Sequence, residues 1–193
     1  MSVAAVAVFC GSRFGARPDF EEAAREMGTS LGRAGMRLVY GGGDVGLMGA
    51  VADATLAAGG RVSGVIPTFL RAREVMHEGV TDLTVTDSMH SRKQLMFARA
   101  DAFVVLPGGL GTFDETIEIV TWRQLKLHDK PIFVVNVAGW ADPMVAMLRA
   151  AVREGFAEAS ALELFEVVPD VATTMARLKQ AVRGPATEDV DRL

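Results

Sequence analysis

The amino-acid sequence predicts an α/β fold, namely a Rossmann-like parallel sheet with helices on both faces, formed as a single domain. The main observation is that short apolar runs alternate with stretches of helical period along the chain. A second is that glycine-bearing segments follow several of these runs, as they do at strand-to-helix turns. The length of 193 residues is enough for one domain with a sizeable core.

The expected strands are runs of apolar and β-branched residues, as in parallel sheets that are buried on both faces. These runs are Val3 to Cys10, Arg37 to Tyr40, Val62 to Ile66, Leu83 to Val85, Ala102 to Leu106, Ile132 to Val137 and, with a weaker pattern, Phe165 to Val168.

The segment after the first strand illustrates how the helices are assigned. Pro18 suits the first turn of a helix, and Gly35 suits the position just after its end. Between them, apolar residues recur on one helical face: Phe20, Ala23, Ala24, Met27 and Leu31. Further helices are expected over Leu47 to Ala58, Ser88 to Ala100, Thr112 to Leu127, Pro143 to Arg153 and Asp170 to Arg183. We therefore expect one domain over residues 1–183 and a mobile tail over residues 184–193.

Composition and charge exclude several classes of protein. Half of the residues are apolar and the net charge is −4, which is typical of a globular chain. Lysines and arginines are scattered, so we expect no nucleic-acid partner. The apolar stretch "VAAVAVFC" is too short to cross a bilayer, and with no targeting segment evident we expect no membrane association and a cytoplasmic location. The single cysteine, Cys10, is interpreted as a small core residue.

Three glycine-bearing loops each follow an expected strand and precede an expected helix: "CGSRFG", "YGGGDVGLMG" and "LPGGLGTFDE". Because the carboxyl ends of parallel strands meet at one edge of a sheet, these loops should project together. Glycine lets backbone N–H groups approach a phosphate, and the following helix N-terminus adds a favourable dipole. The candidate residues of this nucleotide site are Gly11, Ser12, Gly42, Gly43, Gly108, Gly109, Leu110, Gly111 and Thr112. The alternative interpretation of each loop is a tight turn or close packing.

The usual nucleotide fingerprints are absent from the sequence. The first loop carries Gly11 and Gly15 rather than G-x-G-x-x-G, and no P-loop motif occurs. The second strand ends in Tyr40 and Gly41 rather than in the acid that binds an adenosine ribose. These departures favour a nucleoside monophosphate as ligand.

Acids follow the third loop closely, and they have a structural interpretation. Thr112 and Glu115 fit a capping box, and Asp114, Glu115 and Glu118 would stabilise the start of a helix through its dipole. If phosphate binds there, however, cations must offset the carboxylates. The expected helix 88–100 offers Arg92 and Lys93, and Arg99 lies two turns further on, where it could share their face.

One reaction uses all of these groups, namely cleavage of the N-glycosidic bond of a nucleoside monophosphate. Its transition state resembles a ribosyl oxocarbenium ion, which a carboxylate can stabilise while it orients or deprotonates water. Phosphate bound to the glycine loop would orient the sugar. We expect neither a cofactor nor a metal, because His77, His90 and His128 are too scattered in the sequence to form an evident ligand set.

These residues resemble the Lonely Guy (LOG) family, the cytokinin-activating phosphoribohydrolases. The motif P-G-G-x-G-T-x-x-E is met by Pro107, Gly108, Gly109, Gly111, Thr112 and Glu115. The motif M-H-x-R-K is met by Met89, His90, Arg92 and Lys93. The resemblance covers about residues 5–155 and weakens over the last part of the chain.

The resemblance implies hydrolysis of an N6-substituted adenosine 5′-monophosphate to the free cytokinin base and ribose 5-phosphate. It implies Arg92 and Glu115 as the catalytic pair, with Lys93 also on the phosphoribosyl part. The remaining implied substrate contacts are Glu74, the loop Gly108 to Asp114, which includes Phe113, and Thr121. It also implies a homodimer with its sites near the interface. Met89 or Phe97 could form a wall around the N6 substituent.

Three alternatives belong to other classes. The protein could be a nucleosidase for plain AMP in nucleotide salvage, or a non-catalytic carrier of a nucleotide or of molybdenum cofactor. Relatives of the family are also often labelled lysine decarboxylases. That chemistry would require a Schiff-base lysine, whereas Lys126, Lys130 and Lys179 are expected in polar contexts and Lys93 is better explained by phosphate.

Overall fold

A computed structural model describes residues 3–71 and 75–181 of the chain. The expectations for Glu74, for the end of the last helix and for the tail over residues 184–193 therefore lie outside the described residues. Within these residues no helix has both the length and the apolar character that a membrane span requires.

The centre of the fold is a parallel sheet of seven strands in the order β4-β3-β2-β1-β5-β6-β7. Every pairing is parallel, and in the middle Val8 lies opposite Val104. The strands are β1 (Ala5–Phe9), β2 (Arg37–Tyr40), β3 (Val62–Pro67), β4 (Asp82–Thr86), β5 (Ala102–Val105), β6 (Ile132–Val135) and β7 (Glu166–Val168). All seven expected strands are confirmed.

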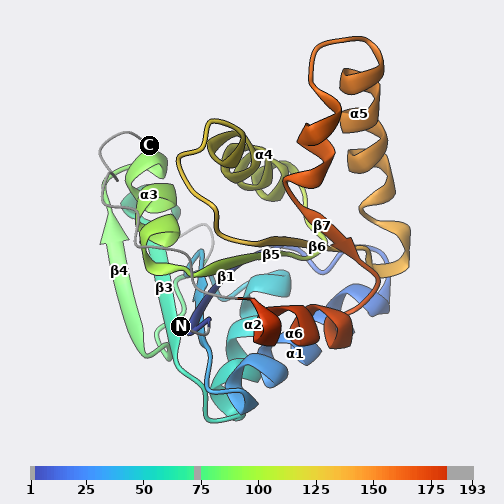
Figure 1. The fold of residues 1–193 in the computed structure, drawn as a ribbon. Coiled ribbons are helices and arrows are strands. Elements are labelled where there is room, and N and C mark those ends of the chain that lie inside the picture. Colours follow the sequence, from blue (N-terminus) through green and yellow to red (C-terminus); the bar gives the residue numbers. More distant parts are fainter. Residues whose placement is uncertain (1–2, 72–74, 182–193) are drawn as a thin grey trace.

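Helices cover both faces of the sheet, as expected for this fold class (Figure 1). One face carries α1 (Pro18–Arg33), α2 (Gly46–Ala57) and α6 (Val171–Gln180). The other carries α3 (Met89–Arg99), α4 (Leu110–Gln124) and α5 (Asp142–Arg153). Short 3-10 helices lie at η1 (Thr68–Leu70), η2 (Val137–Gly139) and η3 (Ala159–Glu163).

The two faces have separate hydrophobic cores, which explains why the strands are apolar throughout. In β1, Val6 and Val8 pack into the core beneath α1, α2 and α6. Ala7 and Phe9 alternate with them and pack into the core on the other side. Side chains alternate between the faces of a strand, so a strand buried on both faces needs apolar residues at every position.

Helix α1 ends as the sequence predicts. Gly35 has φ of +67°, a conformation that glycine adopts without steric cost. The Gly35 N–H donates to Gly32 O, and the Met36 N–H donates to Leu31 O. This pair of bonds is the Schellman motif, which satisfies carbonyls at the end of a helix.

Strand order reverses at β1, and this reversal positions the functional site. From β1 the chain builds outward through β2, β3 and β4, then returns to place β5 on the other side of β1. The loops after β1 and β5 therefore lead to helices on opposite faces. Ligands of open α/β sheets bind in the crevice that forms at such a point.

Candidate active site

The three glycine loops converge at the carboxyl edge of the sheet, as expected. The Gly11 N–H donates to Pro107 O at 3.0 Å, which joins the loops after β1 and β5. A Cβ on Gly108 would overlap the Thr112 side chain and lie 2.9 Å from Gly11 N. A Cβ on Gly46 would overlap the backbone of Ser12 and Arg13. At Gly108 and Gly46, glycine is thus explained by close packing between loops.

Gly109 and Gly111 differ from these packing positions. A Cβ on either would meet no atom within 4 Å, and neither residue is among the glycines with positive φ. Packing and backbone conformation therefore do not account for glycine at these two places. At Gly111, close approach of a ligand to the backbone is the remaining physical reason, whereas Gly109 also caps helix α4, a position that glycine favours.

Helix α4 begins earlier than the sequence predicts, which overturns the capping-box interpretation. Its cap is Gly109, without a side-chain cap, and its first residue is Leu110. Thr112 is the third helical residue, so it cannot cap the helix, and Asp114 and Glu115 fall in the second turn. The N–H groups of the first turn, which have no partner inside the helix, thus receive no capping side chain.

Arg92 and Glu115 are both buried and line the same small lobe of the crevice. Their exposed fractions are 5% and 9%. Arg92 Nε donates to Val65 O at 3.1 Å, and Nη2 donates to Gly41 O at 3.2 Å. This lobe has a volume of about 150 Å³. Its lining is Cys10, Gly11, Ser12, Met48, Met89, Arg92, Gly109, Leu110, Gly111, Thr112 and Glu115.

Cys10 lines this lobe but stays a neutral thiol. Burial, and then the nearby negative charge of Glu115, raise the pKa of the Cys10 thiol far above its usual value. A thiol is nucleophilic as the thiolate, so Cys10 is poorly suited to nucleophilic attack. The interpretation of Cys10 as a small core residue is consistent with its burial.

A second, largely apolar lobe of about 530 Å³ adjoins the first and shares Gly11, Ser12, Gly109 and Leu110 with it. Its further lining is Arg13, Phe14, Gly15, Phe20, Leu47, Pro107, Gly108 and Trp140. Trp140 Nε1 donates to Gly108 O at 3.2 Å, and its ring stacks on Phe113 with centroids 5.5 Å apart. Phe113 therefore supports the wall from behind.

Sequence reasoning missed Trp140 and Phe14 as lining residues, although a signal for both was available. Each follows the carboxyl end of a strand, β6 and β1 respectively, where side chains reach the crevice. The sequence analysis considered only the glycines of these loops and therefore missed the two aromatic residues.

Gly42 and Gly43 were expected near the nucleotide, but they line neither lobe. Gly42 O accepts from the His77 N–H, and Gly43 forms an antiparallel bridge with Met76. A Cβ on Gly42 would lie 3.1 Å from Ile66 Cβ. Glycine at position 42 is explained by its φ of +78° and its packing against β3, while Gly43 pairs with the segment before β4.

Lys93 and Asp114 lie beside the lobes rather than in their lining. Lys93 Nζ is 3.1 Å from Asp114 Oδ2 and 3.0 Å from Glu118 Oε1. Burial alone would lower the pKa of Lys93, but the bonds and charges of Glu118 and Asp114 outweigh it, and the pKa is raised. The lysine is thus a paired cation at the rim of the site.

Helix α3 runs from the carboxyl edge of the sheet to the opposite edge, which separates Arg99 from Arg92. Arg99 donates to Thr84 and lines a polar cavity at the strand starts. The expectation that both arginines serve one site is therefore wrong, because seven residues of helix span about 10 Å.

Two further expectations are also wrong in placement. Phe97 is 1% exposed and stacks on Phe103 in the core, so it cannot wall a substrate pocket, whereas Met89 lines the small lobe. Lys130 is not in a polar turn, because it is buried with Nζ donating to Phe97 O at 2.8 Å.

Thr121 is exposed on α4 and lines neither lobe of its own chain.

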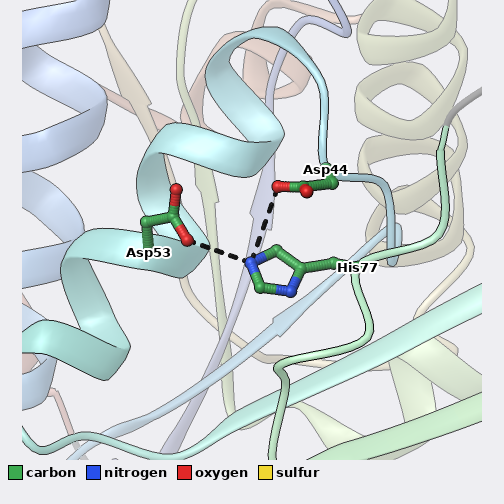
Figure 2. Close-up of side chains that lie close together, drawn as sticks. All are labelled: Asp44, Asp53 and His77. Carbon is green, nitrogen blue, oxygen red and sulfur yellow. Dashed lines mark hydrogen bonds and ion pairs between the residues drawn. The ribbon is translucent and has the colours of Figure 1, made fainter.

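A second polar cluster joins Asp44, Asp53 and His77 (Figure 2). Nε2 of His77 is 3.1 Å from Asp53 Oδ1 and 3.6 Å from Asp44 Oδ1. The Gly79 N–H donates to Nδ1 at 3.1 Å, so Nδ1 is unprotonated and the ring proton is on Nε2. That nitrogen therefore faces the carboxylates as a donor, whereas a metal would need its lone pair. The sequence search considered only histidines grouped with one another and missed this cluster.

The fold and the site define a class: a Rossmann-like α/β protein whose crevice combines an open glycine-lined helix N-terminus with a buried arginine and a buried glutamate. The family model described as "Possible lysine decarboxylase" matches residues 48–178. A probable cytokinin riboside 5′-monophosphate phosphoribohydrolase of Oryza sativa subsp. japonica is 45% identical, covering 92% of this chain and 78% of its own. A cytokinin riboside 5′-monophosphate phosphoribohydrolase of Arabidopsis thaliana is 40% identical, covering 92% and 83%. The chain belongs to this LOG family.

Solved structures agree on the fold. The molybdenum cofactor carrier protein of Chlamydomonas reinhardtii aligns with a TM-score of 0.70 at 21% identity, covering 92% of this chain and 96% of its own. The molybdenum cofactor binding protein of Rippkaea orientalis aligns with a TM-score of 0.70 at 18% identity, covering 93% and 98%. At such identities the likeness concerns architecture alone.

Proposed function

We propose that this protein hydrolyses the N-glycosidic bond of N6-substituted adenosine 5′-monophosphates, releasing the free base and ribose 5-phosphate. The observation that carries the proposal is the small lobe itself. One cavity is lined by Glu115, which is buried, and by the backbone of Gly109 and Gly111, where no protein atom would contact a Cβ. The names of the LOG relatives supply the reaction and the substrate class.

In this proposal the first turn of α4 receives the 5′-phosphate. The N–H groups of Leu110, Gly111 and Thr112 lie in that turn, which no side chain caps. The helix dipole favours an anion there, and Gly109 and Gly111 leave space for it. Binding the phosphate fixes the sugar, so that its binding energy serves orientation at C1′.

Glu115 acts at the sugar and Arg92 balances the charge of the lobe. The bond from C1′ to the base nitrogen breaks, and its electron pair leaves with the base, which gains a proton. Water adds its oxygen to C1′ and gives a proton to the Glu115 carboxylate, which stabilises the positive charge on the sugar and then passes this proton, directly or through water, to the departing base. The Arg92 guanidinium is fixed by two carbonyls and adds positive charge beside phosphate and carboxylate.

The larger lobe favours an N6-substituted nucleotide over plain AMP. It opens directly beside the small lobe and is bounded by Phe14, Phe20 and Trp140. An apolar substituent gains free energy when it leaves water for such a wall, by roughly 0.8 kcal/mol per buried methylene. The buried Glu115 disfavours a carrier. A protein that only holds an anion requires the glycine cradle but not a buried carboxylate beside it.

A cytoplasmic homodimer completes the proposal. Leu110, Ile117 and Thr121 of α4 and its C-cap residue Leu125 recur at helical spacing and share one face. Leu110 is 87% exposed and Leu125 63% exposed, which is costly unless another surface covers them. A partner on this face would bring Thr121 toward the interface. Light scattering at micromolar concentration decides between this dimer and a monomer.

The test is turnover of AMP and of isopentenyl-AMP, with released base and ribose 5-phosphate measured by chromatography. We expect turnover of isopentenyl-AMP, and a fall in kcat on the order of 10²- to 10³-fold in both Glu115→Gln and Arg92→Ala. Arg25→Ala removes an exposed ion pair on α1 and serves as the control with wild-type rates. A wild-type protein that binds both nucleotides and cleaves neither is a carrier, and full activity in Glu115→Gln removes that residue from the reaction.

A further inference from the structure

A short clip joins the second glycine loop to the segment before β4. The Asp44 N–H donates to Val75 O at 2.7 Å, and the His77 N–H donates to Gly42 O at 3.0 Å. Gly43 and Met76 form an antiparallel bridge between these bonds. A bridge of this length has few bonds to hold it, so its stability depends on side chains around it.

The imidazole of His77 closes the clip. The residue is 7% exposed, and its Nε2–H faces Asp53 of α2 and Asp44 of the loop (Figure 2). Its Nδ1 accepts the Gly79 N–H, so both ring nitrogens are engaged. One side chain thereby ties the segment 75–79, the glycine loop and helix α2 together.

The loop held by this clip also holds Arg92. Gly41 O, one residue before Gly42, accepts from Arg92 Nη2. A Cβ on Gly41 would overlap Nη2 and lie 3.2 Å from Met48 Sδ, so the guanidinium packs directly on the loop backbone. A shift of the loop must therefore move the guanidinium or break its bond.

We propose that His77, through its bonds to Asp53 and Gly79 and its contact with Asp44, is a positioning residue that fixes the second glycine loop and thereby the guanidinium of Arg92. The catalytic consequence rests on the proposed function, whereas the placement of Arg92 can be measured without turnover. The competing interpretation of the cluster is a site for a divalent cation. The proton on Nε2 argues against it, and the variants below separate the two.

Four variants test the proposal. His77→Ala keeps the backbone bonds of the clip but removes the imidazole that closes it, whereas His77→Gln keeps an N–H donor toward the carboxylates. Asp53→Ala removes an acceptor from an exposed position, where loss of the fold is not expected, and Asp53→Asn keeps an acceptor oxygen. A hydrogen-bonded clip tolerates both conservative variants, whereas a cation site loses an imidazole or a carboxylate ligand in each of the four and should bind the cation more weakly.

The first measurement is the NMR signal of the Arg92 Nε–H in protein labelled with ¹⁵N-arginine, assigned by its loss in Arg92→Lys. We expect this signal to shift and its hydrogen exchange to quicken in His77→Ala and Asp53→Ala, and to stay near wild type in His77→Gln and Asp53→Asn. An unchanged signal in both alanine variants overturns the proposal, whether or not the protein hydrolyses nucleotides. If His77→Ala does not fold, Asp53→Ala and Asp53→Asn carry the comparison.

The second measurement determines kcat and KM separately for isopentenyl-AMP in each variant. We expect kcat to fall on the order of tenfold in the two alanine variants, because small misplacement of a catalytic group is costly. KM should change by less than about twofold, because the α4 cradle that binds phosphate is untouched. Loss of wild-type activity in EDTA with recovery in Zn²⁺ or Mn²⁺ would instead establish a metal site. Failure of wild type to turn over refutes the proposed function, and the NMR comparison still decides the role of His77.

Discussion

At the scale of single residues, the glycines of the crevice fall into two groups. Gly108 and Gly46 have no room for a Cβ, so they are explained by the contact between loops. Gly109 and Gly111 have open space instead. A methyl group placed there would disturb a ligand and leave the protein fold intact.

Gly111→Ala tests this distinction. Residue 111 lies in the first turn of α4 with no positive φ, so alanine should keep or raise stability, by up to about 1 kcal/mol from helix propensity. The methyl group should nevertheless raise KM for isopentenyl-AMP on the order of tenfold by crowding the phosphate. Thermal unfolding and initial rates measure the two effects. The control is Gly35→Ala, where positive φ predicts a loss of about 1–2 kcal/mol with unchanged KM. An unchanged KM in Gly111→Ala would remove the cradle from this position.

At the scale of secondary-structure elements, the sequence predicted every strand and every α-helix of the described residues, because the apolar pattern is strong on both faces of the sheet, but it predicted none of the three short 3-10 helices. It misplaced the start of α4, because a glycine cap leaves no polar side chain to mark it. It also grouped Arg92 with Arg99, because helical period reveals the face of a helix but not which end reaches the crevice.

Contacts between elements were the least predictable part. The sequence indicated Lys93 as a cation near the carboxylates of the next helix, but no spacing indicated that Asp114 and Glu118 would be the two that it binds. His77 likewise meets Asp53 across 24 positions of the chain. Such pairs depend on how two loops and a helix pack, whereas the convergence of the glycine loops follows from strand order alone.

The loop after β1 provides a prediction about substrate preference. Phe14 is 46% exposed and lines the apolar lobe. Phe14→Ala should lower the ratio of kcat/KM for isopentenyl-AMP to that for AMP on the order of three- to tenfold, because apolar area beside the substituent is lost. Phe156→Ala, which is 88% exposed and lines neither lobe, should leave the ratio unchanged. Equal losses for both substrates in Phe14→Ala would place the N6 substituent elsewhere.

At the scale of the whole molecule, stability depends on polar groups buried between the sheet and α3 and α4. His128 is 8% exposed and packs edge-on against Phe97 and Phe103. Its Nε2 meets Ile119 O at 2.8 Å, and its Nδ1 accepts the Lys130 N–H. The ring is therefore neutral, with its proton directed to a carbonyl.

This buried ring predicts a fall in stability in mild acid. Burial first, and then the charges of Lys130 and Arg123, lower the pKa of His128 from 6.5 to about 4. The unfolded chain thus binds a proton at a higher pH than the native protein. The contribution of the neutral His128 ring to the free energy of unfolding is complete above pH 6.5 and is lost as the pH falls from there toward 4. Between pH 7 and pH 5 the free energy of unfolding should decrease by about 1–2 kcal/mol from this group.

Urea unfolding at pH 7, 6 and 5 measures this decrease. The comparison is His128→Gln, which can still donate to Ile119 O but cannot take up a proton. The variant should be less stable than wild type at pH 7, and its stability should depend less on pH. Over this range most carboxylates remain ionised, and His77 and His90 are common to both proteins, so the difference in slope reports on His128. Parallel slopes in the two proteins would mean that the ring accepts a proton without leaving its place in the core.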